Sequence, residues 1–171
     1  GYIVPKNDEF FGEYIPDHND RLNFISNFSG SYGLALILKN KNYLFVDGRY
    51  TLQAKNQSKK IFKVITIPDK TPSDILRKKK LVIGFDPNLF TKKSLSIFFG
   101  KSECKYKPIL KNLIDEIWKR KIKNNVNKFF ILPAGSVCEK YQSKIYKITN
   151  YLKKRKSEFL FITASENCLL Y

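Results

Sequence analysis

Two features of this chain bear on chemistry: its one histidine, and an arginine at a polar corner of the sequence. His18 lies in the irregular segment 16–20, where a histidine is more often a surface residue than a ligand or a base. A metal-dependent hydrolase needs several His and carboxylate ligands at one point, and a Ser-His-Asp or Cys-His mechanism would have to use this histidine. We therefore predict no catalytic residue and no metal ligand within the chain.

The glycine-rich segment 29–33 matches neither of two common reactive loops. It is not a G-x-S-x-G nucleophile elbow, and no Gly-Lys-Ser/Thr follows it, as a phosphate-binding loop requires. We expect a structural loop whose glycines adopt positive φ, which costs glycine little. Asp8 and Asp86 occur in turn-like contexts, for which we also favour a structural role.

Arg49 is the residue that we favour for binding. It follows Gly48 at the end of a predicted strand, where a side chain can be directed outward. Only five of the 32 basic residues are arginine, so an arginine at this corner indicates that its planar guanidinium is used.

The pattern of apolar runs predicts an α/β fold. We expect strands over 2–4, 34–38, 43–46, 62–67, 81–85 and 105–110, and helices over 20–28, 50–57 and 72–79, from 91 and from 112. Strands that alternate with helices favour the α/β class. Trp118, the only tryptophan, is expected in the core.

The chain divides by composition into two predicted domains, residues 1–120 and 121–171, joined by the polar segment 119–125. In the second, Ser136 and Glu139 form a capping-box pattern before a helix whose apolar residues recur every three or four positions. A strand is expected over 158–162. Because an apolar segment ends the sequence, we expect this second α/β domain to be truncated.

The formal net charge of +17 is a reason to consider a nucleic-acid partner. The basic residues are scattered, however, and the two dense runs, 77–80 and 153–156, close predicted helices, where positive charge complements the helix dipole. A lysine excess together with many Asn, Ile, Tyr and Phe is also what an AT-rich genome produces. We therefore favour a solvated basic surface and keep nucleic acid as the less favoured alternative.

The cellular setting is indicated by cysteine usage and hydropathy. Three widely spaced cysteines form neither a disulfide framework nor a zinc pattern, which fits a reducing, cytoplasmic environment. The sequence has no apolar run of about eighteen residues, so we expect no membrane partner.

A series of short motifs runs along the chain: Tyr2-Ile3-Val4-Pro5, Glu13-Tyr14-Ile15-Pro16, Asp20-Arg21-Leu22, Ile25 to Gly33, Val46-Asp47-Gly48-Arg49-Tyr50, Gln53-Ala54, Ile83 to Pro87, Asn112 to Trp118 and the segment from Ser136 to Asn167. In these motifs most of the chain resembles the N-terminal domain of the Xaa-Pro aminopeptidases (aminopeptidase P), and the end resembles the start of their middle domain. One departure is Asn27, where the family usually has glycine.

The resemblance implies a mixed β-sheet flanked by helices, of the ribonuclease-H-like creatinase N-terminal type. It implies a hydrolase, a cytosolic and often homodimeric metallopeptidase that removes the N-terminal residue preceding proline. Dinuclear manganese, or a similar divalent metal, would be held by a catalytic domain that this chain lacks. The implied partners are a peptide with proline at the second position, the catalytic domain of the same polypeptide and a second subunit.

The resemblance also implies a role for Arg49. In the family the matching arginine reaches across the domain cleft to the substrate, so we expect Arg49 to bind a peptide carbonyl or carboxylate downstream of proline. Two alternatives stay open. Arg49 could instead pair with Asp47 and only hold the corner. The chain could also be a non-catalytic module of the same superfamily that binds peptides or proteins without hydrolysis, although the Asp47–Tyr50 corner belongs with the catalytic members.

Overall fold

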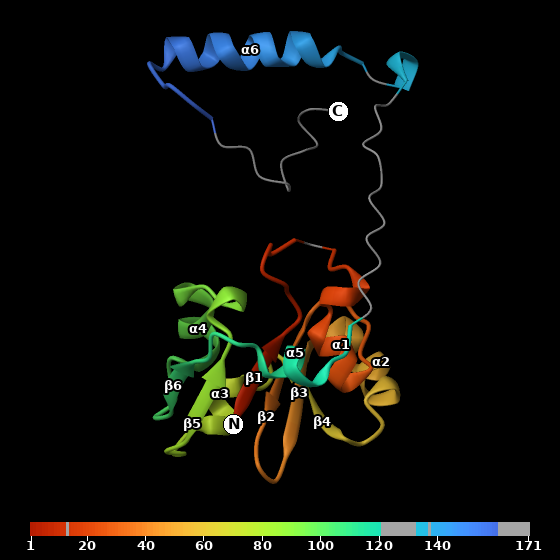
Figure 1. The fold of residues 1–171 in the computed structure, drawn as a ribbon, viewed down its shortest axis with the longest axis vertical. Coiled ribbons are helices and arrows are strands. Elements are labelled where there is room, and N and C mark those ends of the chain that lie inside the picture. Colours follow the sequence, from red (N-terminus) through yellow and green to blue (C-terminus); the bar gives the residue numbers. More distant parts are fainter. Residues whose placement is uncertain (13, 121–132, 137, 161–171) are drawn as a thin grey trace. The chain divides into compact units, whose positions relative to one another are not determined.

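Figure 1 shows the fold in a computed structural model that describes residues 1–12, 14–120, 133–136 and 138–160. The chain separates into two compact units, Gly1–Ile122 and Lys123–Tyr171, which are described one at a time. The expectation that the second unit begins another α/β domain stays a prediction.

The first unit alternates strands and helices along its described residues. Its strands are β1 (Tyr2–Pro5), β2 (Gly33–Ile37), β3 (Asn42–Asp47), β4 (Phe62–Ile67), β5 (Val82–Phe85) and β6 (Lys105–Pro108). Its α-helices are α1 (Arg21–Ser26), α2 (Thr51–Gln57), α3 (Pro72–Leu76), α4 (Lys92–Phe99) and α5 (Leu113–Ile117). These elements lie where the apolar runs predict them, and their bounds differ from the predicted bounds by only a few residues.

The strands form one mixed sheet in the order β4-β3-β2-β1-β5-β6. β2 runs antiparallel to β1 and β3, while β1 with β5, β5 with β6 and β3 with β4 pair in parallel. The predicted fold class, a mixed sheet flanked by helices, is therefore confirmed. One consequence matters for function: every strand except β2 ends at the same edge of the sheet, and β2 begins there. We call this edge the carboxyl edge.

Successive residues of each strand point to opposite sides of the sheet, so apolar side chains lie on both faces. Helices pack on both of these faces. On one face, Ile3, Leu36 and Phe45 pack with residues of α3 and α4 such as Leu76 and Phe99. On the other face, the sheet packs against α1, α2 and α5 through Leu22, Ala54 and Ile114. Two apolar layers thus fix the positions of the strand ends and of the residues that follow them.

The prediction of positive φ for the glycines in the loop before β2 is wrong. Gly30 and Gly33 have negative φ, and Asn27 carries the left-handed conformation instead, with φ 57° at the end of α1. Gly30 is required for another reason: a Cβ there would lie 2.3 Å from the ring of Phe28, which is fully buried. Asparagine tolerates the left-handed conformation better than most residues, which explains why it can replace glycine at position 27.

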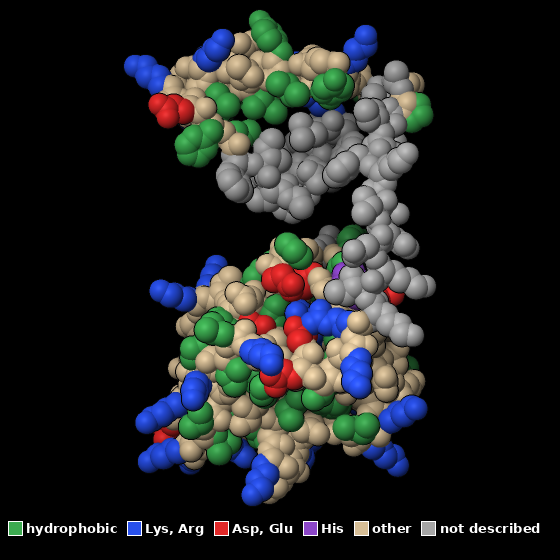
Figure 2. All heavy atoms as spheres, in the orientation of Figure 1, with side chains coloured by type: hydrophobic (Ala, Val, Ile, Leu, Met, Phe, Trp, Pro, Cys, Tyr) green, Lys and Arg blue, Asp and Glu red, His purple; other side chains and the backbone are tan. Residues whose placement is uncertain are grey.

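The basic side chains on the surface of the first unit are scattered and do not form one continuous patch in the view of Figure 2. Figure 2 shows Lys and Arg side chains at many separate points around the outline of this face, with a mixed group of acidic and basic side chains nearer its middle. Among the cysteines, Cys104 is half-buried and Cys138 is exposed, both as free thiols, and Cys168 lies outside the described residues.

The second unit contains α6 (Tyr141–Lys154) and a 3₁₀ turn, Ala134–Ser136. The predicted capping box is wrong, because α6 begins five residues after Ser136 and Lys140 stands at its N-cap without a side-chain cap. Glu139 instead accepts a hydrogen bond from Ser143 and pairs with Lys147 at 2.7 Å. The described part of the predicted strand 158–162, residues 158–160, is not a strand, and the remainder lies outside the described residues.

Candidate functional site

The carboxyl edge of the sheet gathers the polar residues that the sequence singled out. Asp47 ends β3, Asp86 follows β5, and Asp8 lies in the segment after β1. In Figure 1 that segment passes above the upper edge of the sheet. Open α/β sheets bind ligands at the carboxyl ends of their strands, so this edge is the candidate site.

The Arg49 corner is a short 3₁₀ turn, Gly48–Tyr50, capped by Asp47. Oδ1 of Asp47 accepts hydrogen bonds from the backbone N–H of Arg49 at 2.9 Å and from its Nε at 2.8 Å. The hydrogen bond from the guanidinium, and then that from the backbone, lower the pKa of Asp47, so the pair is ionised at neutral pH. Arg49 therefore pairs with Asp47, as expected if it holds the corner.

The same geometry leaves most of the guanidinium available. The Arg49 side chain is 74% exposed, and among the described residues no hydrogen bond or ion pair involves either of its Nη groups. The guanidinium carbon, Cζ, lies 5.5 Å from the centre of the Tyr50 ring, and this contact limits the orientations of the guanidinium. Two Nη groups with free donors can bind carbonyl and carboxylate oxygens.

The corner is supported from below by the glycine loop. The Tyr50 hydroxyl lies 2.8 Å from Oγ of Ser31, and its ring meets the buried Phe28 ring edge-on at 5.9 Å. Gln57 joins α2 to the same loop, since its Nε2 donates to Oγ of Ser29 at 2.9 Å. These contacts fix the turn on which Arg49 stands.

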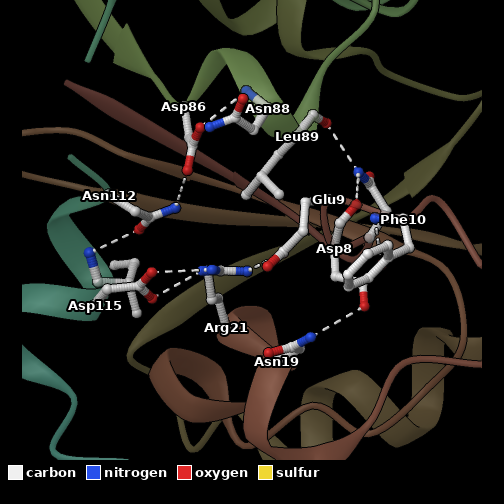
Figure 3. A network of polar contacts seen from close by, with 12 residues as sticks. Asp8, Glu9, Phe10, Asn19, Arg21, Asp86, Asn88, Leu89, Asn112 and Asp115 are labelled. Atoms are coloured by element: carbon white, nitrogen blue, oxygen red, sulfur yellow. Dashed lines mark hydrogen bonds and ion pairs between the residues drawn. The ribbon is translucent and has the colours of Figure 1, made fainter. Parts of the chain in front are cut away.

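A second group of polar side chains, which we call the Arg21 clasp, connects three segments at this edge (Figure 3). Arg21 is only 6% exposed, and its Nε and Nη2 donate to the two carboxylate oxygens of Asp115 at 2.8 and 2.9 Å. Its Nη1 lies 3.3 Å from Oε2 of Glu9. Burial acts to lower the pKa of Arg21, but its carboxylate partners outweigh burial and raise it. The clasp ties α1, α5 and the segment after β1 together.

Arg120 extends the clasp to the end of the first unit's described residues. It pairs with Asp115 and donates from Nη1 to the carbonyl oxygen of His18 at 3.1 Å. Its guanidinium also lies over the Trp118 ring, which stacks on Phe24 at 4.7 Å. Trp118 is half-buried, so its predicted place in the core is only partly correct.

Sequence reasoning missed Arg21, Asp115 and Arg120, although a signal was present. Arginine is rare in this chain, and a rare arginine indicates that its planar guanidinium is used. This signal marks Arg21 and Arg120 as well as Arg49, and both of them contact Asp115.

Asp8 and Asp86 are structural, as predicted. Both are buried, and each accepts a backbone N–H that stabilises a turn: Asp8 from Phe10 at 3.1 Å and Asp86 from Asn88 at 2.9 Å (Figure 3). Asp86 also accepts from Nδ2 of Asn112 at 2.8 Å, which links β5 to the start of α5.

Side chains that could bind a metal are not grouped in the described part of the chain. Within residues 1–12, 14–120, 133–136 and 138–160, no group of three or more His, Cys, Asp or Glu side chains is arranged to hold a metal ion. These residues therefore do not fit the dinuclear centre that the resemblance implies. No helix among the described residues is long and apolar enough to span a membrane.

Comparison with known proteins identifies the class. The sequence profile of the Creatinase/Prolidase N-terminal domain matches residues 8–109, which is more than half of the chain. The chain belongs to this family.

Its relatives are more specific. A probable Xaa-Pro aminopeptidase P of Laccaria bicolor is 32% identical over 95% of this chain, and a Xaa-Pro aminopeptidase of Drosophila melanogaster is 31% identical over 95% of it. A solved structure, the X-prolyl aminopeptidase of Caenorhabditis elegans, superposes with a TM-score of 0.72 and 30% identity over 91% of this chain. That protein is a cytosolic enzyme with a di-nuclear active site.

The match covers only part of these proteins. The chain spans 27% of the Laccaria bicolor relative, 28% of the Drosophila melanogaster relative and 27% of the Caenorhabditis elegans enzyme. It corresponds to their N-terminal domain, and their activities are those of longer polypeptides.

Proposed function

We propose that this chain is the non-catalytic N-terminal part of a cytoplasmic, metal-dependent Xaa-Pro aminopeptidase, which removes the N-terminal residue preceding proline. The observation that carries the proposal is similarity to Xaa-Pro aminopeptidases over 95% of the chain, together with the exposed Arg49 corner at the carboxyl edge. In this proposal the domain forms one wall of the substrate cleft and supports contacts between domains and between two subunits.

Arg49 is the residue proposed to bind substrate. Asp47 accepts from Nε and so orients the guanidinium, while the side chain as a whole is exposed and its two Nη groups have no hydrogen bond among the described residues. They would donate to a carbonyl or carboxylate oxygen of the peptide downstream of proline. Pairing with Asp47 and binding substrate are thus compatible, because they use different nitrogens of the same group.

The proposal places the metal centre in polypeptide outside this chain, since the described residues do not fit it. Two manganese or similar divalent ions would supply an activated water for amide hydrolysis. The residues of this chain would orient the peptide. They would affect the rate only by holding the scissile bond in the reactive geometry.

The test is Arg49→Ala in the full-length protein that contains this chain, assayed with Xaa-Pro tripeptides. Loss of hydrogen bonds from a charged donor predicts a fall in kcat/KM of about tenfold to a hundredfold. Arg77→Ala is the matched control: Arg77 is also exposed, at 64%, and pairs with a nearby carboxylate, Asp74, at 3.2 Å, but it precedes β5 at the opposite edge.

Three results would contradict the proposal in different ways. Equal kcat/KM for the wild type and Arg49→Ala would remove the substrate role and leave Arg49 as a holder of the corner. An equal loss in Arg77→Ala would show a general effect of charge. Binding of prolyl peptides without hydrolysis by the full-length protein would favour the alternative of a peptide-binding module.

A further inference from the structure

A hollow of about 390 Å³ lies beside the Arg49 corner, on the side of the sheet that α4 covers. Its walls come from the end of β1 and the segment after it, the start of β2, the end of β4 and the first turn of α4. Most of the lining is apolar, including Phe11, Ile15, Leu34, Ile67 and Phe90. We call it the edge hollow.

The edge hollow has room for a large side chain. A cavity of about 150 Å³ lined by apolar residues is enough to hold benzene, so this one can admit a leucine or phenylalanine side chain with part of its backbone. Binding pockets of proteins begin at about 300 Å³ and are lined mainly by apolar groups with a few polar ones.

The polar side chains in the wall mostly have partners already. Lys6 pairs with Asp20, Nδ2 of Asn7 donates to the Leu89 carbonyl at 2.9 Å, and Ser31 bonds to Tyr50. Thr91 and Ser94 bond to each other in the capping box of α4. The hollow therefore offers few unmet hydrogen bonds, and an apolar occupant would leave none of these groups unsatisfied.

Two residues that line the hollow, Tyr32 and Ile67, lie next to the start of the Arg49 corner, since Ile67 pairs with Asp47 across β4 and β3. Gly33 pairs with Val46 across β2 and β3, so Tyr32 comes opposite Asp47, which holds Arg49. Burial, and then the negative charge of Asp47, raise the pKa of Tyr32, which agrees with this closeness. The apolar hollow therefore begins next to Asp47, the residue that pairs with Arg49.

We propose that the edge hollow is a subsite for the apolar side chain of the third residue of the substrate, the residue directly after proline. The inference rests on the proposed function, in which Arg49 binds the peptide backbone at this point. A residue of an extended peptide presents both a carbonyl oxygen and a side chain. Arg49 would donate to the oxygen, and the adjacent edge hollow would hold the side chain. The protein would then prefer peptides such as Ala-Pro-Leu or Ala-Pro-Phe over Ala-Pro-Gly.

The test compares kcat/KM and peptide affinity for Ala-Pro-Leu and Ala-Pro-Gly in the full-length protein. We expect the wild type to prefer leucine about tenfold or more, as burial of such a side chain predicts. Gly12 lines the hollow, and a Cβ there meets only the Tyr14 carbonyl oxygen, at 3.6 Å. Gly12→Phe should fill the space and reduce the preference to less than about threefold, while Gly12→Ala keeps it.

A second pair of variants covers the case in which Gly12→Phe does not fold. Ile15→Lys places a charge on the wall of the hollow and should shift the preference from leucine towards glutamate at the third position. Leu52→Lys adds the same charge at an exposed position of α2 away from the hollow and should leave the preference unchanged.

The outcomes separate the inference from the proposed function. Hydrolysis without a preference for leucine, or with a preference that neither variant alters, overturns the edge hollow as a subsite and leaves the peptidase proposal standing. Binding with the expected preference but without hydrolysis, measured by calorimetry on the same protein, supports the subsite and overturns the peptidase proposal. Failure both to bind and to hydrolyse either peptide overturns both.

Discussion

Arg21 and Arg49 place the same side chain at the same edge of the sheet in opposite surroundings. Arg21 is 6% exposed and has contacts to two carboxylates, whereas Arg49 is 74% exposed and has contact to one. A buried guanidinium with its donors engaged holds elements together, because an unpaired charge in that position would be costly. An exposed guanidinium with free donors contributes little to stability and can bind a ligand. Burial, and not residue type, therefore distinguishes an arginine that holds elements together from one whose donors are available to a ligand.

The largest effect is expected from Arg21→Ala. It removes the buried partner of Asp115 and Glu9 and should lower the free energy of unfolding by about 3 kcal/mol, the lower end for such a pair because Asp115 is partly exposed and keeps its ion pair with Arg120. Urea unfolding followed by circular dichroism would measure it. Arg49→Ala is the comparison variant and should leave the unfolding midpoint unchanged. Equal midpoints for the two variants would contradict the division drawn between the arginines.

A smaller effect is expected beneath the Arg49 corner, from Gly30→Ala. The new Cβ would lie 2.3 Å from the ring of Phe28, which cannot move away because it is fully buried, so overpacking should cost about 2 kcal/mol. Gly48→Ala, on the exposed side of the same corner, meets nothing nearer than Thr66 at 3.7 Å and should be tolerated. Thermal unfolding of both variants checks this, and an unaffected Gly30→Ala would show that the loop can rearrange.

The smallest effect is expected from Asp115→Asn, and it depends on pH. Burial acts to raise the pKa of Asp115, but Arg21 and Arg120 outweigh burial and lower it. A carboxyl with a lowered folded pKa stabilises the fold fully above its unfolded pKa, about 3.9, and loses that contribution as the pH falls through the folded pKa. The variant should be less stable than the wild type by about 1.5 kcal/mol at pH 7.

The measurement is urea unfolding of both proteins from pH 7 to pH 2. The difference between them should persist down to about pH 4 and shrink below it. Asp47→Asn is the exposed counterpart: salt should reduce its effect, because the pair with Arg49 lies in solvent. A difference for Asp115→Asn that stays constant with pH would show that the charge of Asp115 is not what stabilises the clasp.

Much of the fold was accessible from the sequence, because its signals are local. Apolar runs gave all six strands of the described sheet, and Asp20, Thr71, Thr91 and Asn112 cap their helices through side-chain hydrogen bonds. The prediction was wrong where a local pattern had a competitor. Glu139 matched a capping box but pairs with Ser143 and Lys147 within the helix that follows.

The sequence by itself determined the alternation of strands and helices, the family and the polar corner at Arg49, since each depends on residues that are neighbours in the chain. Only the tertiary structure decided which arginine is buried. Arg21 and Asp115 are 94 positions apart, and Arg120 meets the carbonyl of His18 across 102 positions. The edge hollow likewise exists because β1, β2, β4 and α4 converge. Such contacts follow from the order of strands in the sheet, and no spacing along the chain encodes them.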